Sequence, residues 1–173
     1  PAAVRLDGWL DRAAFTLALD ELIVRHESLR SRFGVHHGDP VQHILPPEGF
    51  QMAFESFPDK TFEERDKVVH DYATAEAAEP FDLIGGWPLR ARLLQFDEKH
   101  HVFLLTLHHI VADGWSVAVF IQELCSLYNA FSQGQASPLV DLSIQYVDFA
   151  DWQQERWASG GLSAQMTYWQ NAL

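Results

Sequence analysis

The sequence lacks the features of an exported, cross-linked or membrane-inserted protein. Its 173 residues include one cysteine, Cys125, which excludes an internal disulfide framework and suits a reducing cytoplasm. No run of about 20 apolar residues is present, so no membrane span is expected. The N-terminus has no basic segment followed by an apolar one, so no secretory signal is expected either. Because the sequence begins with Pro1 rather than Met, we expect it to be a piece of a longer chain.

Positive charge is also scarce. The 12 Lys and Arg residues stand against 24 Asp and Glu residues, which leaves a formal net charge of -12. This balance argues against a nucleic-acid surface and against a polybasic membrane surface. The hydrophobic fraction of 47% excludes intrinsic disorder, and the length predicts one domain, or one lobe of a larger one, with a real core. What the sequence has in excess is nine His, six Trp and twelve Phe.

Periodicity and turn residues predict alternating strands and helices, and therefore an α/β fold. The strands are expected at residues 4–6, 29–35, 41–45, 50–56, 89–96 and 101–109. The helices are expected from Asp7 or Asp11 to about residue 26, and at residues 62–78, 115–131, 144–158 and 163–173. Thr61 and Glu64 have the spacing of a capping box. The near-continuous apolar run at 101–109 is typical of a strand buried on both faces.

The residues best suited to chemistry follow that strand, where the segment from His108 to Ser116 has the sequence HHIVADGWS. A strand end followed by a helix is where α/β sheets form sites. Since neighbouring strand residues point to opposite faces, we expect one of His108 and His109 to face a cleft and the other to pack. An imidazole can take or give a proton near neutral pH. Asp113 could orient that imidazole, pair with an arginine or hold the loop. Gly114 permits unusual backbone angles, lets a substrate approach the main chain, and lies at a helix start whose free amides could bind an oxyanion.

Other interpretations of these residues stay open. The histidine pair could be ordinary packing at a strand end. A metal site is disfavoured, because adjacent histidines on a strand cannot both reach one metal and no third ligand is spaced nearby. Ser116 lacks the Gly-x-Ser-x-Gly turn of a serine nucleophile. Cys125 lies among apolar residues of an expected helix, so we expect it in the core.

Three segments, in order, resemble a known family. His108-His109-x-x-x-Asp113-Gly114 resembles the signature of the chloramphenicol-acetyltransferase-like acyltransferases. Residues 24–33, VRHESLRSRF, resemble the Arg-His-Glu-x-Leu-Arg-Thr-x-Phe motif of the condensation domains of nonribosomal peptide synthetases. Residues 146–152, YVDFADW, resemble their Tyr-x-Asp-Tyr-Ala-x-Trp motif, and YWQ at 168–170 is similar to a helix that follows in that family.

The resemblance implies that residues 1–173 are the N-terminal lobe of a condensation domain, with a chloramphenicol-acetyltransferase-like mixed β-sheet flanked by helices. The family's first motif, expected before Pro1, and the motifs of the second lobe are absent. Ser31 stands in place of the usual Thr, and Phe149 in place of the usual Tyr. Both histidines are kept, unlike in heterocyclization relatives and in relatives that recruit an oxygenase. Epimerization relatives keep the pair too but follow Asp-Gly differently, and Asp113-Gly114-Trp115-Ser116 is closer to the peptide-bond-forming branch. We expect the fragment alone to be inactive.

In this family, donor and acceptor peptidyl carrier proteins present thioesters on phosphopantetheine arms at opposite ends of a tunnel between two lobes. The resemblance implies that the acceptor amine attacks the donor thioester and that His109 is catalytic, either as general base or by orienting the amine. The residues supporting the site would be His108, Asp113 and Arg25, with Arg25 as the ion-pair partner of Asp113. The residues next to the substrate would be Gly114, Trp115 and Ser116. An adjacent adenylation domain is implied as well, whereas no metal, nucleic acid or membrane is.

The remaining residues of these motifs have plainer interpretations. Arg30 and Arg32 could be solvated strand residues or could contact a carrier protein. The segment 146–152 is expected to pack as an amphipathic helix. Two other functions stay open, namely a non-catalytic docking module for a carrier protein or tailoring enzyme, and a stand-alone acyltransferase that uses a coenzyme A thioester.

Overall fold

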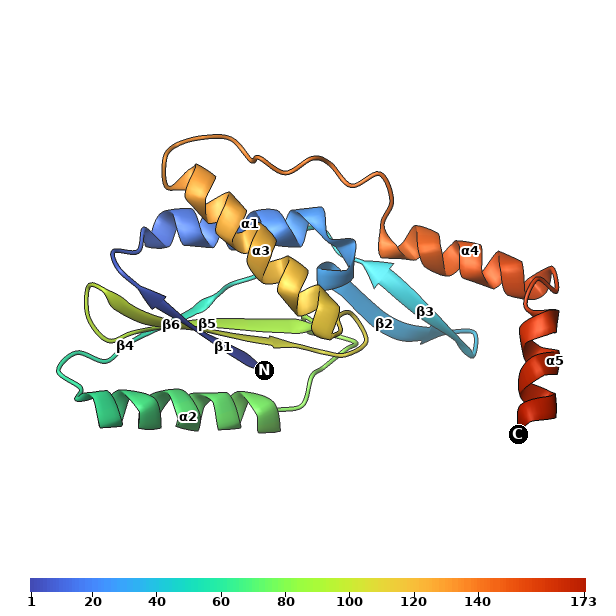
Figure 1. Ribbon diagram of the computed structural model, residues 1–173, viewed down its shortest axis with the longest axis horizontal. Coiled ribbons are helices and arrows are strands. Elements are labelled where there is room, and N and C mark those ends of the chain that lie inside the picture. The colour runs from blue at the N-terminus through green and yellow to red at the C-terminus, as the bar shows by residue number, and fades with distance from the viewer. The chain divides into compact units, whose positions relative to one another are not determined.

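The computed structural model describes residues 1–173 and divides them into two compact units, residues 1–140 and residues 141–173. The first unit contains a four-stranded sheet with helices on both faces and a separate two-stranded hairpin (Figure 1). The second unit contains two helices. The expected α/β class is confirmed.

The sheet has the strand order β1 (Ala2–Asp7), β6 (His100–Leu107), β5 (Leu89–Gln95), β4 (Ala53–Ser56). Strand β6 runs antiparallel to both neighbours, while β4 and β5 are parallel, so the sheet is mixed, as the family resemblance implies. A parallel pair needs a crossover connection, and helix α2 (Phe62–Ala78) provides it. In the register of the first pair, Ala2 lies opposite Leu105.

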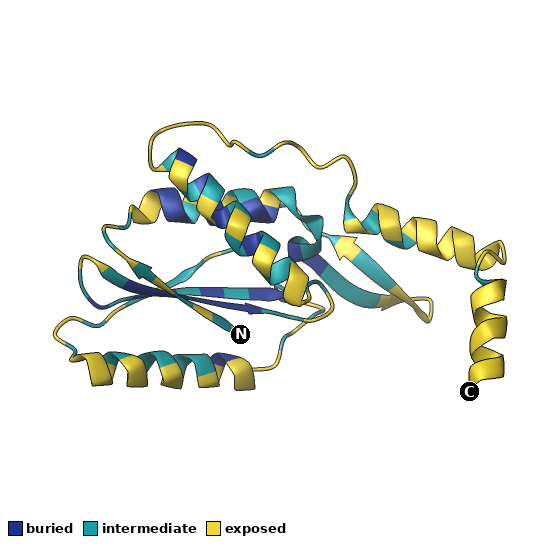
Figure 2. Ribbon diagram, in the orientation of Figure 1, coloured by how far each residue is buried: buried dark blue, intermediate teal, exposed yellow.

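Each face of the sheet has its own core. Helices α1 (Arg12–Arg25) and α3 (Gly114–Phe131) cover one face, and α2 covers the other (Figures 1 and 2). Successive side chains of β6 alternate between them: Phe103 and Leu105 join the core under α1 and α3, and Val102 and Leu104 join the core over α2. The six central residues of β6 are buried, which confirms a strand covered on both faces.

The local capping signals define the helix starts. The carboxylate of Asp11, rather than Asp7, accepts from the amides of Ala13 and Ala14 at 2.9 and 3.0 Å, so α1 begins after Asp11. At α2 the Thr61 amide donates to the Glu64 carboxylate at 2.8 Å, and the Glu64 amide donates back to the Thr61 hydroxyl at 3.3 Å. The predicted capping box is confirmed.

The expected strand at 29–35 begins later than predicted. A 3-10 helix, Glu27–Arg30, comes first because the Ser31 hydroxyl donates to the carbonyl of Glu27 at 2.9 Å and closes that turn. Strands β2 (Ser31–His36) and β3 (Asp39–Ile44) then form the antiparallel hairpin. Arg30 Nη1 donates to the Leu45 carbonyl at 2.5 Å, and Arg32 Nε donates to the Gly86 carbonyl at 3.2 Å. Both arginines therefore hold the chain together, and neither is simply solvated.

The second unit consists of α4 (Tyr146–Ala158) and α5 (Ser163–Ala172), and neither helix buries a residue. The rings of Tyr146, Phe149 and Trp152 contact one another in sequence, at 5.9 and 5.6 Å, but stay 60, 42 and 52% exposed. These rings form no core within the second unit, because helices of 13 and 10 residues cannot enclose one by themselves. No helix of the chain combines the length and apolar character needed to cross a bilayer.

Candidate functional site

The histidine pair lies on a turn rather than on the strand. Strand β6 ends at Leu107, and the next amide, that of His108, donates to the Pro88 carbonyl at 2.9 Å. The Val111 amide donates to the His108 carbonyl at 3.1 Å and closes the turn. The expectation that strand alternation sends the two histidines to opposite faces is therefore wrong, because both residues lie beyond the last residue of the strand.

His108 is held by its ring. Its Nδ1 accepts a hydrogen bond from the Ile110 amide at 3.0 Å. An accepting imidazole nitrogen carries no proton, so neutral His108 is protonated at Nε2. The ring also meets the edge of Phe81, with ring centres 5.5 Å apart and planes at 86°. These contacts suit the supporting role that the resemblance implies for His108.

His109 is oriented differently, since its side chain is exposed and no hydrogen bond or ring contact within the chain holds it. Its backbone, by contrast, lies in the turn closed by His108 and Val111. The His109 imidazole is therefore exposed to solvent while its main chain is fixed. A side chain that takes a proton from a substrate needs both properties.

Asp113 caps helix α3. Its carboxylate accepts from the Ser116 amide at 2.8 Å and from the Ser116 hydroxyl at 2.7 Å. The hydrogen bonds from Ser116 hold the pKa of Asp113 below its usual value. Of the three roles open to Asp113, the structure shows that of holding the loop. The Ser116 amide is occupied by this carboxylate. Binding of an oxyanion by the Gly114 amide stays a prediction.

Arg25 does not pair with Asp113, contrary to expectation. Its Nε donates to Glu123 at 3.2 Å, and its Nη1 donates to the Val140 carbonyl at 2.7 Å. The His26 ring shares the same carboxylate at 2.6 Å. Glu123 lies ten residues beyond Asp113 on α3, which is about 15 Å along a helix, and the end of α1 packs beside that later turn. Arg25 is thus a support of the α1–α3 contact.

The residues expected next to the substrate begin α3. Trp115 and Ser116 line a hollow of about 180 Å³ together with His26, Ser28 and Val111, and Trp115 is 82% exposed. Gly114 has no positive φ, and an added Cβ would find no atom within 4 Å. Its conformation therefore does not require glycine. Close approach of a substrate stays a prediction for this residue.

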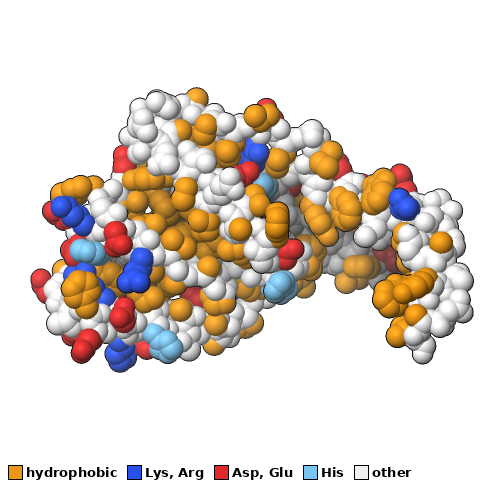
Figure 3. Space-filling view, in the orientation of Figure 1, with side chains coloured by type: hydrophobic (Ala, Val, Ile, Leu, Met, Phe, Trp, Pro, Cys, Tyr) orange, Lys and Arg blue, Asp and Glu red, His pale blue; other side chains and the backbone are white.

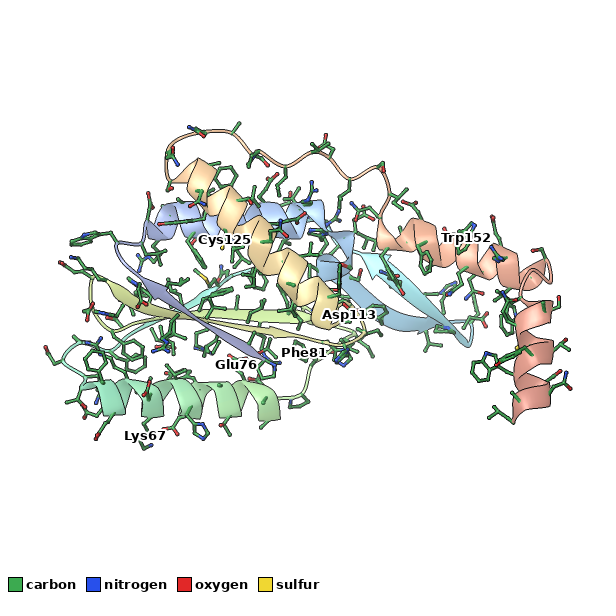
Figure 4. All side chains as sticks on the ribbon, in the orientation of Figure 1. Lys67, Glu76, Phe81, Asp113, Cys125 and Trp152 are labelled. Carbon is green, nitrogen blue, oxygen red and sulfur yellow. The ribbon has the colours of Figure 1, made fainter.

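Cys125 is exposed on the surface of α3, which corrects its expected place in the core (Figure 4). The buried positions of that helix are Phe120, Leu124, Leu127 and Ala130, each about one helical turn from the next, and Cys125 lies off this stripe. It borders a hollow of about 290 Å³ between α3 and β1, where hydrophobic side chains gather in Figure 3.

Sequence reasoning missed Glu123, although a signal was present. It is the sole charged side chain of α3, and a partly buried carboxylate needs a cationic partner. Phe81 was missed as well, and nothing in its spacing indicates contact with His108, because the two residues meet only in the folded chain.

The whole chain, residues 1–173, matches the family described as Condensation domain. The chain belongs to the condensation-domain family. It is 43% identical to a linear gramicidin synthase of Brevibacillus parabrevis over 100% of this chain and 2% of that protein. The X-domain from teicoplanin biosynthesis, solved in complex with OxyB, is 32% identical with a TM-score of 0.83, covering 98% of this chain and 36% of that one.

The fold is shared more widely than the sequence. The starter condensation domain of rhizomide synthetase superposes with a TM-score of 0.85 at 18% identity, over 99% of this chain and 41% of that one. The predicted family and the condensation-domain fold, chloramphenicol-acetyltransferase-like in kind, are therefore confirmed. This condensation-domain chain spans only a small part of the curated relatives it matches and less than half of the solved ones.

Proposed function

We propose that this chain carries the catalytic loop for amide-bond formation between two thioester-bound substrates in nonribosomal peptide synthesis. The observation that carries the proposal is the exposed imidazole of His109 on a turn fixed by His108 and followed by a capped helix. The match to the condensation-domain family and the likeness to a gramicidin synthase support it. His109 is the catalytic residue in this proposal.

The chemistry needs one proton to be moved. The acceptor amine attacks the carbonyl carbon of the donor thioester, the carbon–sulfur bond of the tetrahedral intermediate breaks, and the donor arm leaves as a thiol. His109 serves either by taking the proton from the amine or by holding the amine in line and stabilising charge in the intermediate. His108 supports the turn, and Gly114, Trp115 and Ser116 lie beside the reacting groups.

We infer that residues 1–173 are the N-terminal lobe of a two-lobed domain, since solved relatives are more than twice as long. The implied partners are donor and acceptor peptidyl carrier proteins with phosphopantetheine arms, and an adjacent adenylation domain. The single exposed thiol of Cys125 supports a reducing compartment such as the cytoplasm. A tunnel closed by a second lobe also explains why the fragment alone is expected to be inactive.

The test replaces His109 in the intact protein that contains these residues. We expect His109→Ala to lower the rate of amide formation by about 100-fold or more, the usual contribution of a positioned acid–base group. The measurement is the dipeptidyl product that accumulates on the acceptor carrier protein. His70→Ala is the matched control, because His70 is an exposed histidine on α2, away from the loop, and the rate should stay unchanged.

An unchanged product yield in His109→Ala would exclude the catalytic role. One observation then favours docking instead, because the similar X-domain is described in complex with OxyB. Binding of a carrier protein or tailoring enzyme, measured with the same variant, would distinguish a docking module. Acyl transfer from coenzyme A thioesters without any carrier protein would favour the stand-alone acyltransferase.

A further inference from the structure

Phe81 lies between an arginine and the ring of His108. The Arg90 guanidinium carbon is 3.9 Å from the centre of the Phe81 ring, and the His108 ring meets Phe81 edge-on at 5.5 Å. Phe81 belongs to the connection after α2, Arg90 to β5, and His108 to the loop after β6. Figure 4 places Phe81 between Glu76, at the end of α2, and Asp113, at the start of α3. One aromatic ring thus joins the end of α2 to the catalytic loop.

Arg90 is a fixed platform for that ring. Its Nε donates to the Glu76 carboxylate at 2.8 Å, and Glu76 is only 6% exposed. Its Nη2 donates to the carbonyls of Glu76 and Glu79 at 2.8 and 2.9 Å. These carbonyls form the C-terminal end of α2, where positive charge is favoured. The guanidinium therefore cannot follow Phe81 if the ring moves.

The backbone that follows Phe81 is equally constrained. The Asp82 carboxylate accepts from the amides of Ile84 and Gly85 at 3.0 and 2.9 Å, and the Gly86 amide donates to the Asp82 carbonyl at 2.8 Å. A Cβ at Gly85 would lie 2.6 Å from the Asp82 carboxylate, and one at Gly86 would lie 2.7 Å from the Asp82 carbonyl. A side chain at Gly86 would collide with the backbone, and one at Gly85 would displace the Asp82 carboxylate, so this turn is tight and Phe81 is held from both directions.

We propose that Phe81 is a positioning residue for the ring of His108 and, through that ring, for the turn that carries His109. Its catalytic consequence rests on the proposed function. The His108 ring accepts from the Ile110 amide inside the same turn, so a ring that rotates releases that hydrogen bond and loosens the turn. A smaller or flexible side chain at position 81 removes the edge contact that blocks the rotation.

The experiment compares three variants of the intact protein. Phe81→Leu removes the ring, and Phe81→Tyr keeps it. Tyr72→Leu is the matched control, since Tyr72 stacks on Arg92 at 5.1 Å and Arg92 also binds Glu76, but Tyr72 does not contact the loop. The first measurement is the tautomer of His108, from the nitrogen NMR signals of its ring, assigned by their loss in His108→Gln. The second measurement separates kcat from KM for the acceptor.

We expect wild type, Phe81→Tyr and Tyr72→Leu to show His108 protonated at Nε2 alone. Phe81→Leu should show a mixture of tautomers, with kcat about tenfold or more lower and KM for the acceptor within about twofold. A His108 tautomer unchanged in Phe81→Leu, or changed equally in Tyr72→Leu, overturns the positioning role. If the wild-type protein forms no amide, the proposed function fails, and the NMR comparison still decides the role of Phe81.

Discussion

One glycine begins α3 and another follows its end, and the two positions are glycine for different reasons. Gly114 begins the helix with an ordinary φ and open space around it, whereas Gly134, just after the helix, has a φ of 68°. The left-handed conformation at position 134 favours glycine, because a residue with a side chain would adopt it at a cost of about 1–2 kcal/mol. Gly114 has no such structural need, so the proposed approach of the substrate to this residue can be tested without disturbing the fold.

A pair of alanine variants separates the two reasons. Gly114→Ala should leave the free energy of unfolding unchanged or raise it by up to about 1 kcal/mol, because alanine favours a helix. The same variant should lower the rate of amide formation, since its methyl group would intrude where the proposed function places the substrate. Gly134→Ala should instead lose about 1 kcal/mol of stability with little effect on the rate. Urea unfolding and the product assay provide the two measurements, and a Gly114→Ala enzyme with full activity would contradict the substrate argument.

At the same scale, the sequence identified the residues of the loop better than their partners. Asp113, Gly114 and Ser116 could be singled out because they follow one another in the chain. The partner of Asp113 could not, because the choice between Ser116 and Arg25 depends on where the end of α1 meets α3. Asp113 bonds to a residue three positions away, and Arg25 binds a carboxylate nearly a hundred positions away.

Among the elements, the contact between α1 and α3 depends on a single carboxylate. Glu123 accepts from both Arg25 and His26, which end α1, and its side chain is 15% exposed. Partly buried hydrogen bonds to charged groups contribute more than exposed pairs do. We call this contact of Glu123 with Arg25 and His26 the seam. The orientation of α3, and therefore of the loop that precedes it, depends on the seam.

Glu123→Gln tests the seam. The variant keeps the shape of the side chain but removes its charge, so we expect the free energy of unfolding to fall by about 2 kcal/mol. Asp71→Asn is the control, because the Lys67–Asp71 pair on α2 is well exposed and should contribute about 0.5 kcal/mol or less (Figure 4 shows Lys67 on α2). Equal losses in the two variants, measured by urea unfolding, would show that the seam has no special weight.

Element boundaries were predictable wherever the decisive contact is local. Thr61 and Glu64 fix the start of α2 within one turn, and the apolar run of β6 is unbroken in sequence. The strand at 29–35 was misplaced because a 3-10 turn depends on the Ser31 hydroxyl, which no periodicity reveals. The exposed aromatics of α4 show a related limit, since amphipathic spacing predicts a face to be covered but not what covers it.

For the whole molecule, one buried histidine links folding to pH. His101 lies in β6 opposite Leu6 of β1, is 5% exposed, and has no partner for its Nδ1. Burial lowers the pKa of His101 in the folded chain. The pKa of a histidine in the unfolded chain is about 6.5, so near and below that pH the unfolded chain binds more protons at His101 than the folded chain does. The folded state therefore keeps its full stability above about pH 6.5, where His101 is neutral in both states, and it loses stability as the pH falls.

His101→Gln should therefore make stability less sensitive to mild acid. Between about pH 7.5 and about pH 5.5, the wild-type free energy of unfolding should fall more steeply than that of the variant. The lowered pKa values of Asp97 and Asp113 do not interfere, because those carboxylates keep their full contribution above about pH 4. The free energy of unfolding of both proteins is measured by urea unfolding across this pH range. If it depends on pH in the same way in both, His101 is not the source of the acid sensitivity.

The pairing of β1 with β6 also has a consequence for how the protein is made. Ala2 lies opposite Leu105, so β1 is synthesised about a hundred residues before the strand with which it pairs. The neighbouring strands β5 and β6 are close in sequence and can form their hairpin as soon as both have been synthesised. Because the His108–His109 turn follows β6 directly, this turn emerges just after the strand that lets the sheet close. Until then, β1 is an unpaired strand in a growing chain, where premature pairing with another chain is the risk that synthesis has to avoid.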